Sequence, residues 1–227
     1  MSDAPPPEAL PPVTAPEPEA EPWHPVRMVV TDDLRRSRLT VFFRLLLAIP
    51  HYLWISLIGV VVGILVFVNW FILLAVAQTP KGIHYFLAGY IRYTTQLEAY
   101  LFLAANPYPP FWPVGETDYP VTLEIDPPAR QSRWKTFFRL FLAIPAILIS
   151  ASSLAGGARF GGYTVGIAFT IAFFAWWVAL FLGRVPRGFR DLLAFCVGYS
   201  AQLGAYLFLV TDRYPYSGPN RFVPPRE

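Results

Sequence analysis

The stretch that decides the fold occurs twice: FFRLLLAIP at residues 42–50 and FFRLFLAIP at residues 137–145. Working outward from it, residues 24–50 align without gaps to residues 119–145, with 13 of 27 positions identical. Residues 70–109 align in the same way to residues 176–215, with 16 of 40 identical. Self-similarity of this extent indicates a repeated structural unit. The alignment offset rises from 95 to 106 between the two blocks, so the second copy contains extra residues, expected in its Gly-rich segment 156–162.

The composition indicates a membrane protein. Apolar residues make up 55% of the 227 residues and charged residues only 15%, against about 25% in a typical soluble domain. Charges are scarce in two long runs, residues 41–77 and 137–183. Such runs are longer than buried core helices and are typical of membrane spans of about 20 residues. The sequence therefore predicts a mainly α-helical integral membrane protein.

Each copy contains the same parts in the same order. It begins with a short alternating segment, residues 26–30 or 121–125, which predicts a β-strand. An arginine-rich segment and a long apolar region follow, which we expect to form a transmembrane helical hairpin. A Pro-x-Gly break then leads to an amphipathic or interfacial helix, residues 82–104 or 188–210. The predicted organisation is a disordered Pro/Glu-rich tail (1–23), two membrane repeats (24–112 and 113–216) and a C-terminal tail (217–227).

The glycines of residues 156–162 decide how the apolar region of copy two is interpreted. Each Gly costs about 1 kcal/mol relative to Ala inside a helix, so residues 137–154 and 163–183 are predicted to be separate helices. We expect the same turn in copy one, near Gly59 to Gly63. The 37 residues of that run are short for two spans, which leaves a shallow or re-entrant hairpin as the alternative there.

Basic residues set the expected topology, because Lys and Arg are enriched on the cytoplasmic flanks of membrane spans. With two spans per copy, 17 of the 18 Lys and Arg residues lie on one side, and only Arg159 lies on the other. Three spans per copy would invert copy two, whereas both copies carry the same charge bias. The sequence therefore predicts four spans with both termini cytoplasmic.

The combined pattern resembles a known family. It consists of FFRLxLAIP, an apolar hairpin, Pro-x-Gly, an AYLFL helix and a Tyr-Pro ending, over about residues 24–215. This pattern resembles the bacterial family known as domain of unknown function 4389 (DUF4389). The resemblance implies a multi-pass protein of the bacterial inner (plasma) membrane and implies no activity. Copy two departs from the pattern after Tyr214 and Pro215 and in its Gly-rich insertion.

Basic residues near the start of each apolar run are candidates for contact with lipid headgroups or anions. Arg44 and Arg139 lie one turn inside the runs, where an arginine that snorkels to the interface or packs against a partner is the simpler interpretation. A basic cluster beside the inner leaflet attracts anionic lipid with about 1 kcal/mol per charge. The full candidate set is Arg35, Arg36, Arg38, Arg44, Arg133, Lys135 and Arg139.

Two other groups of residues are candidates for structural roles. A glutamine and a tyrosine one helical turn apart recur in both copies and are expected to make helix-packing or inter-repeat polar contacts. A polar cavity between the copies is the functional alternative. Pro50 and Pro145 are predicted to kink or end a helix, because proline removes an amide donor. The glutamine and tyrosine pairs are Gln96 with Tyr100, and Gln202 with Tyr206.

No catalytic constellation is expected. The chain has no Walker loop and no Gly-x-Ser-x-Gly, and its three His and one Cys predict neither a metal site nor a cofactor. His51, Arg92 and Glu98 have no equivalent in copy two and are assigned no chemistry. The net charge of +3 is spread along the membrane flanks, so nucleic acid is not an expected partner.

The predicted function is therefore a non-enzymatic accessory, scaffold or lipid-interacting component. Its expected partners are membrane lipids and, for assembly, another membrane protein or a second copy. The alternative is a small transporter, channel or lipid-moving protein with a path between the two repeats. Residues 1–22 are expected to be dispensable for membrane insertion, since their composition cannot support a folded core.

The two predicted strands are expected to lie together on the cytoplasmic side. A lone strand leaves its amides unpaired, so pairing is predicted either directly or through an extended segment such as residues 221–223. Their apolar faces would cover the third helices or the inner leaflet. Such a sheet would join the two copies into one body.

Overall fold

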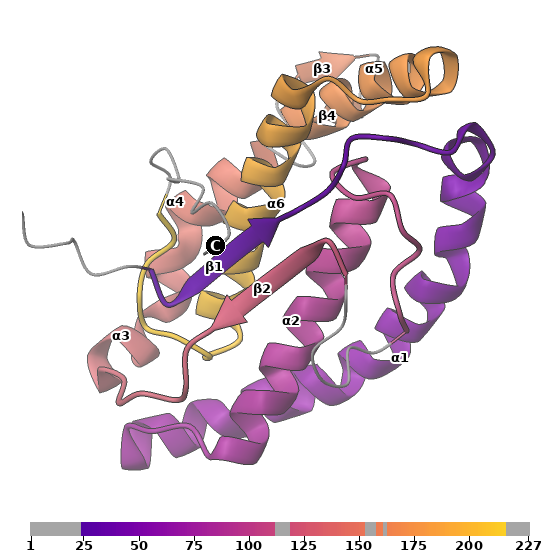
Figure 1. The fold of residues 1–227 in the computed structure, drawn as a ribbon. Helices are drawn as coiled ribbons and strands as arrows, with labels where there is room; N and C mark the ends of the chain where they lie inside the picture. Colours follow the sequence, from indigo (N-terminus) through magenta and orange to yellow (C-terminus); the bar gives the residue numbers. More distant parts are fainter. Residues whose placement is uncertain (1–23, 112–118, 153–157, 161–162, 217–227) are drawn as a thin grey trace, which may run out of the picture.

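Residues 24–111, 119–152, 158–160 and 163–216 are described by the computed structural model of the protein (Figure 1). Within them the chain is mainly helical, as predicted. The predicted tails 1–23 and 217–227, which include the segment 221–223, lie outside the described residues. The elements in chain order are β1 (Val26–Val30), α1 (Arg38–Val76), α2 (Lys81–Leu101), β2 (Val121–Ile125), α3 (Arg133–Phe137), α4 (Arg139–Ser150), β3 (Ala158–Phe160), β4 (Tyr163–Val165), α5 (Ile167–Leu182) and α6 (Arg187–Leu207).

The two strands that precede the apolar runs pair directly, which confirms that prediction. β1 and β2 are antiparallel, with Met28 opposite Leu123 at the centre. These two residues occupy equivalent positions in the two copies, at the offset of 95, so an approximate two-fold axis passes between them. On the outward face, Arg27 and Glu124 form an ion pair of 3.2 Å across the strands. On the inward face, Val121 is fully buried.

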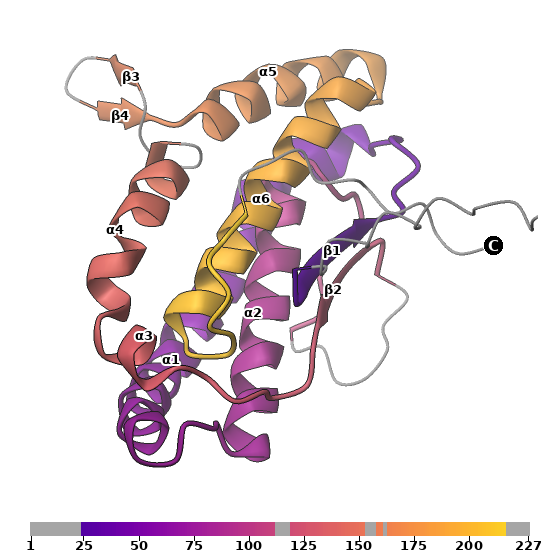
Figure 2. The ribbon, with the colours of Figure 1, turned by 90° about the vertical axis from the view of Figure 1, so that its left-hand side faces the viewer.

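The sheet covers α2 and α6, the third helices of the two copies. A Cβ added at Gly198 of α6 would lie 3.6 Å from Cε of Met28, so β1 approaches α6 closely. Arg92 of α2 donates from Nε to the carbonyl oxygen of Leu123 at 2.9 Å. Figure 2 shows the sheet on one side of these helices and α4 on the other. Both helices are thus packed between the sheet and the outer helices, and they begin and end within a few residues of the predicted bounds.

The predicted turn in the apolar region of copy one is wrong. α1 runs through Gly59 and Gly63 as one helix of 39 residues. A Cβ at Gly59 would lie 3.4 Å from the Tyr90 hydroxyl oxygen, so α1 passes close to α2 at this glycine. Two glycines cost about 2 kcal/mol in a helix interior, which is less than a turn that leaves several backbone groups unpaired. Pro50 also lies inside α1, which continues past it along a curved path (Figure 1).

The predicted break in copy two is confirmed. α4 ends at Ser150 and α5 begins at Ile167, because the antiparallel pair β3–β4 occupies part of the intervening segment. Gly156 and Gly157 themselves lie outside the described residues. Pro145 lies inside α4, so neither proline ends a helix, and the predicted kinks at Pro50 and Pro145 stay predictions.

Apolar side chains cover the outward faces of α1, α4 and α5. α1 is the one described helix that is long and apolar enough to cross a membrane, and only 17% of its most apolar stretch is buried. The exposed fractions of Leu45 and Phe141 are 78% and 72%. α4 and α5 are similarly apolar, but they have only 12 and 16 residues.

Candidate functional site

The arginines of the two FFRL motifs lie inside the protein. Arg44 and Arg139 are 2% and 3% exposed. Each donates from Nη1 to a carbonyl oxygen near the end of a central helix, Arg44 to Tyr100 of α2 and Arg139 to Tyr206 of α6. The last carbonyls of a helix lack intrahelical partners and form its negative end, so a cation is stabilising there. Each guanidinium also lies over the ring of the same tyrosine, 4.2 and 4.6 Å from its centroid.

The two arginines differ in how fully they are hydrogen bonded. Arg139 also donates to the carbonyl oxygen of Thr211 at 3.0 Å and to Oε1 of Gln131 at 2.8 Å. For Arg44, Nε and Nη2 are buried without a hydrogen-bond partner among the described residues. The reason is that Arg36 stands where copy two has Gln131, and an arginine cannot accept a hydrogen bond.

Arg36 has its own buried partners. Its Nη2 lies 2.6 Å from Oδ2 of Asp32 and donates to the carbonyl oxygen of Leu103 at 2.9 Å. Gln131 makes the equivalent contact in copy two, from Nε2 to the carbonyl oxygen of Leu209 at 2.8 Å. Both side chains therefore hold the chain that leaves a central helix.

The remaining basic candidates are exposed. Arg38 and Arg133 donate to the carbonyl oxygens of Phe181 and Ala75, at 3.0 and 2.7 Å, which are equivalent contacts in the two copies. Contact with lipid headgroups therefore stays a prediction for the four exposed side chains, whereas Arg36, Arg44 and Arg139 point into the protein. The four are Arg35, Arg38, Arg133 and Lys135.

The predicted glutamines connect the two copies. Gln96 of copy one donates from Nε2 to the carbonyl oxygen of Val121 in copy two, at 3.4 Å. Gln202 of copy two donates to Val26 in copy one, at 3.2 Å. Tyr100 and Tyr206 instead contact the arginine of their own copy. The structure thus brings each tyrosine to an arginine and each glutamine to the strand of the other copy.

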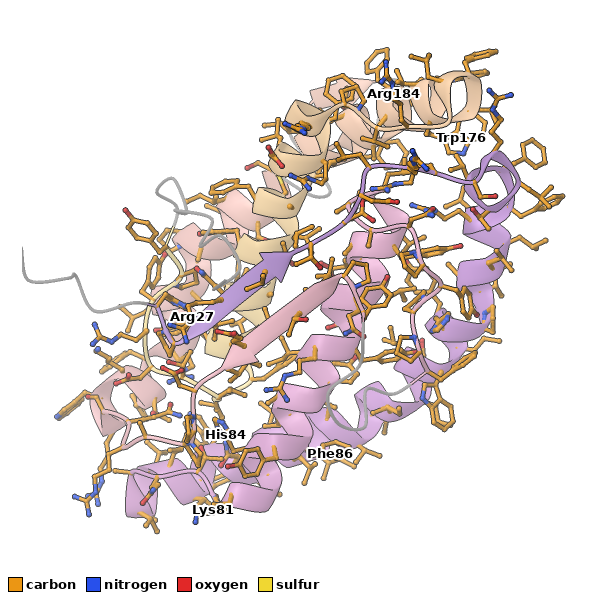
Figure 3. The ribbon with its side chains drawn as sticks, in the orientation of Figure 1. Arg27, Lys81, His84, Phe86, Trp176 and Arg184 are labelled. Carbon is orange, nitrogen blue, oxygen red and sulfur yellow. The ribbon has the colours of Figure 1, made fainter. Side chains whose placement is uncertain are left out.

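Two tryptophans cross between the copies in the same way. Trp70 donates from Nε1 to the carbonyl oxygen of Thr136 at 3.2 Å, and Trp176 donates to that of Val41 at 2.9 Å. Figure 3 shows Trp176 beside the start of α1, close to Arg184 and far from Lys81. Every one of these crossed contacts has its counterpart at the equivalent positions of the other copy.

A polar cavity of about 260 Å³ lies between α2 and α6. Thr94 and Glu98 line it from α2. Thr94 is two residues after Arg92, and Glu98 is two residues after Gln96; Arg92 and Gln96 both contact the sheet. Two residues are about 200° of an α-helix, so the cavity lies on the side of these helices away from the sheet. Ser200, the equivalent of Thr94, lines it from α6.

Glu98 is the functional candidate that the sequence analysis missed. Burial raises the pKa of its carboxyl to about 7, and hydrogen bonding to Ser200 opposes that rise. The signal in the sequence was its spacing of two from Gln96, together with the small residue Gly204 at the equivalent position of copy two. A cavity with a carboxylate therefore lies between the two copies, but Gln96, Tyr100, Gln202 and Tyr206, for which a polar cavity was the alternative, do not line it.

His51 has a packing environment. Its ring is buried, stacks on Phe111 at 4.3 Å and shares a hydrogen bond of 2.6 Å with the Tyr93 hydroxyl. Among the described residues, no group of three His, Cys, Asp or Glu side chains could hold a metal ion.

One family matches the chain. The model of the family described as "Domain of unknown function (DUF4389)" matches residues 38–113 and 161–217, which together are more than half of the chain. The first matched segment covers most of copy one and the second covers the later part of copy two, which is consistent with two tandem copies. Neither a curated protein nor a solved structure matches the chain.

Proposed function

The chain belongs to the DUF4389 family, and on that premise we propose that it is a non-enzymatic integral membrane protein that serves as an accessory or scaffold component in contact with lipid. The observation that carries the proposal is the distribution of side chains. Leucines and phenylalanines of α1, α4 and α5 lie outside, whereas Arg44 and Arg139 lie inside. Soluble proteins rarely expose contiguous apolar surfaces of this extent, and such a surface is stable in contact with lipid.

The proposed topology has both termini on the cytoplasmic side. Both copies carry the same charge bias, so neither is inverted, and the axis that relates them stands along the membrane normal. Two backbone pairings are related to each other by this axis. Arg35, just before α1, pairs with Arg184, and Gln78, just after α1, pairs with Arg130. α1 therefore begins and ends at the same depth, although it is about 58 Å long. We propose that α1 enters and leaves the membrane on one side, in place of the two spans expected for copy one.

In copy two, α4 and α5 approach the membrane from the same cytoplasmic side, and the pair β3–β4 joins their far ends. Only Arg159 of the basic residues lies there, which agrees with the enrichment of Lys and Arg on the cytoplasmic side. The copies therefore differ in how far their apolar regions reach across the membrane.

Assembly is supported by the sheet. β1 and β2 form a two-stranded sheet, so each strand has one edge without a partner strand among the described residues. Side chains of α2 and α6 already donate to some carbonyl oxygens of these two strands, so a partner would pair with the backbone groups that remain. Strand edges without a partner strand can pair with extended segments of other proteins. A cytoplasmic edge of this kind suits an accessory protein that recruits a partner.

The cavity with Glu98 favours a second candidate, a small transporter or lipid-moving protein with a path between the copies. The paired strands cover the opposite side of α2 and α6. Flux across liposomes that contain the purified protein separates the two candidates, because an accessory protein gives none on its own.

Cysteine labelling tests the topology. In a Cys196→Ser background, single cysteines replace Ser2, Val60, Arg159 and Glu227, and intact cells receive a reagent that cannot cross the membrane. We expect labelling at Arg159 alone, labelling of both termini after permeabilisation, and none at Val60 in either case. External labelling of a terminus or of Val60 contradicts the topology.

Purification in mild detergent tests the scaffold role. We expect a second protein, or a second copy of the chain, to accompany it in a fixed ratio. A monomer that purifies alone and conducts a solute in liposomes overturns the proposal in favour of the transporter.

A further inference from the structure

The cavity between α2 and α6 contains a carboxylate without an ion-pair partner. Glu98 is partly buried and has no ion pair with a Lys, Arg or His side chain of the described residues, and the wall around it combines apolar groups such as Ile91 and Leu203 with a few hydroxyls. A carboxylate removed from water is costly unless a proton or a cation neutralises it. The cavity therefore favours a positively charged occupant.

Aromatic rings form another part of its wall. Tyr90 and Phe208 line the cavity with ring centroids 5.9 Å apart. The faces of such rings attract ammonium groups, and aromatic walls beside a carboxylate are a common means of holding quaternary ammonium ions. This arrangement selects an organic ammonium over a metal ion, which would need several oxygen ligands instead.

Hydroxyl oxygens provide further acceptors. The Thr94 hydroxyl donates its own proton to the backbone carbonyls of Tyr90 and Ile91, at 3.1 and 3.0 Å, which leaves its lone pairs available. Ser200 lies across from it on α6. A primary ammonium has three N–H donors, and the Glu98 carboxylate with these two hydroxyls would match them.

The size of the cavity fits a headgroup. Its volume of about 260 Å³ is below the usual range of about 300–1,000 Å³ for sites of drug-sized ligands. Gly204 occupies the position in copy two that Glu98 occupies in copy one, so one side of the cavity carries the charge and the other leaves the space.

We propose that this cavity binds an ammonium group, primary or quaternary, carried by a zwitterionic lipid headgroup or by a free organic amine. Glu98 neutralises the charge, Tyr90 and Phe208 face it, and Thr94 and Ser200 accept its hydrogen bonds. The lipid source rests on the proposed membrane embedding, because the cavity lies on the side away from the cytoplasmic sheet. The free-amine source does not depend on it.

Binding to detergent-purified protein tests the site itself. Choline chloride and ethanolamine hydrochloride are titrated against wild type, Glu98→Gln and the matched control Glu124→Gln, whose carboxylate lies on the outward face of the sheet. We expect binding of at least one amine, a loss of about tenfold or more in Glu98→Gln, and no change in the control. A steric variant, Gly204→Leu, should also lose binding, because nothing lies within 4 Å of a Cβ there and the larger side chain would fill the cavity.

Gly188→Leu is the control for the steric variant, since a Cβ at Gly188 also meets nothing within 4 Å and it lies at the other end of α6. A lipid arm uses nanodiscs of phosphatidylethanolamine, phosphatidylcholine or phosphatidylglycerol, with the lipids retained on the protein counted by native mass spectrometry. Retention of either zwitterionic lipid that depends on Glu98 identifies a headgroup, and amine binding without it identifies a free ligand. The proposal is overturned if neither amine nor zwitterionic lipid binds, or if Glu98→Gln binds as wild type does. External labelling of a terminus or of Val60 in the cysteine-labelling test, with amine binding intact, would refute only the proposed embedding.

Discussion

The apolar regions of the two copies have different structures between the same two ends. In copy one the region is the single helix α1, and in copy two it is α3 and α4, the pair β3–β4 and then α5. Yet the amide of Arg36 donates to the carbonyl oxygen of Gly183, and the amide of Gln131 donates to that of Ala77, both at 2.8 Å. These contacts are equivalent, and each joins one copy to the other. The ends of an apolar region are therefore fixed by the opposite copy, while its middle is free to change.

The same comparison separates shared from individual features. Contacts that cross between the copies recur in pairs, such as Trp70 with Thr136 and Trp176 with Val41. Features confined to one copy, such as Glu98 in the cavity, have no counterpart. If the crossed contacts carry the stability, their loss should be the most costly, and the features confined to one copy should account for the differences between the copies.

The largest effect is expected at the shared sheet. Val121→Asp places an unpaired charge at a fully buried position against α2, and we expect loss of folded protein, a cost above about 4 kcal/mol. Thr122→Asp, on the exposed face of the same strand, should change stability by less than about 1 kcal/mol. Thermal unfolding in detergent measures both. A Val121→Asp protein that unfolds at the wild-type temperature would show that the sheet does not join the copies.

Removal of the two FFRL arginines should be unequal. Arg139→Met leaves two carbonyls and Gln131 without a donor, whereas Arg44→Met leaves one carbonyl. Hydrogen bonds to charged groups contribute about 1.5–3 kcal/mol each at most, so we expect a loss of about 3 kcal/mol for Arg139→Met and about half of that for Arg44→Met. Equal losses, measured as free energies of unfolding, would mean that Arg44 has partners the described contacts do not account for.

The carboxylate of copy one should make stability depend on pH. The pKa of Glu98 rises from 4.5 to about 7 on folding, so between these values the folded state holds more protons than the unfolded state. The contribution of Glu98 to stability is therefore greatest at low pH and falls as pH rises through this window, by at most about 3 kcal/mol. Glu98→Gln should remove this slope and Glu124→Gln should retain it, as measured by chemical unfolding at a series of pH values.

The smallest effects are expected from two substitutions that change the free energy of unfolding in opposite directions. Ala77 and Gly183 are equivalent residues at the ends of α1 and α5, and both have left-handed backbones with φ of 60° and 68°. A side chain in this conformation costs about 1 kcal/mol relative to glycine. Ala77→Gly should therefore raise, and Gly183→Ala lower, the free energy of unfolding by about that amount. Changes of the same sign would show that the two helix ends are not equivalent.

Local patterns in the sequence were sufficient for part of the fold. Alternation in residues 26–30 and 121–125 predicted strands that the structure pairs, and the Pro-x-Gly breaks placed the starts of α2 and α6 within a residue. The glycines of copy two predicted its break, whereas those of copy one misled. The reason is that α1 packs against α2, with the Tyr90 hydroxyl beside Gly59, and such a contact between distant residues is contained in no local pattern.

The candidate site was less accessible to prediction. Arg44 and Arg139 could be identified as unusual because they lie in apolar runs. Their binding to carbonyl oxygens of α2 and α6 could not be predicted from that position. Glu98 was set aside because copy two lacks it, although a cavity between two copies needs only one carboxylate. Repetition in the sequence identifies what the copies share, and it is uninformative about a site that depends on their difference.

The crossed contacts have a consequence for synthesis. β1 emerges from the ribosome well before β2, and Gln96 is made before the carbonyl of Val121 that it binds. The first half of the chain must therefore wait with an open strand edge and unfilled contacts, a state prone to mispairing. A chain that stopped after copy one would find the same contacts only in a second molecule, as a symmetric homodimer. The present protein is equivalent to such a dimer joined into one polypeptide, which keeps both halves at equal number and within reach of each other.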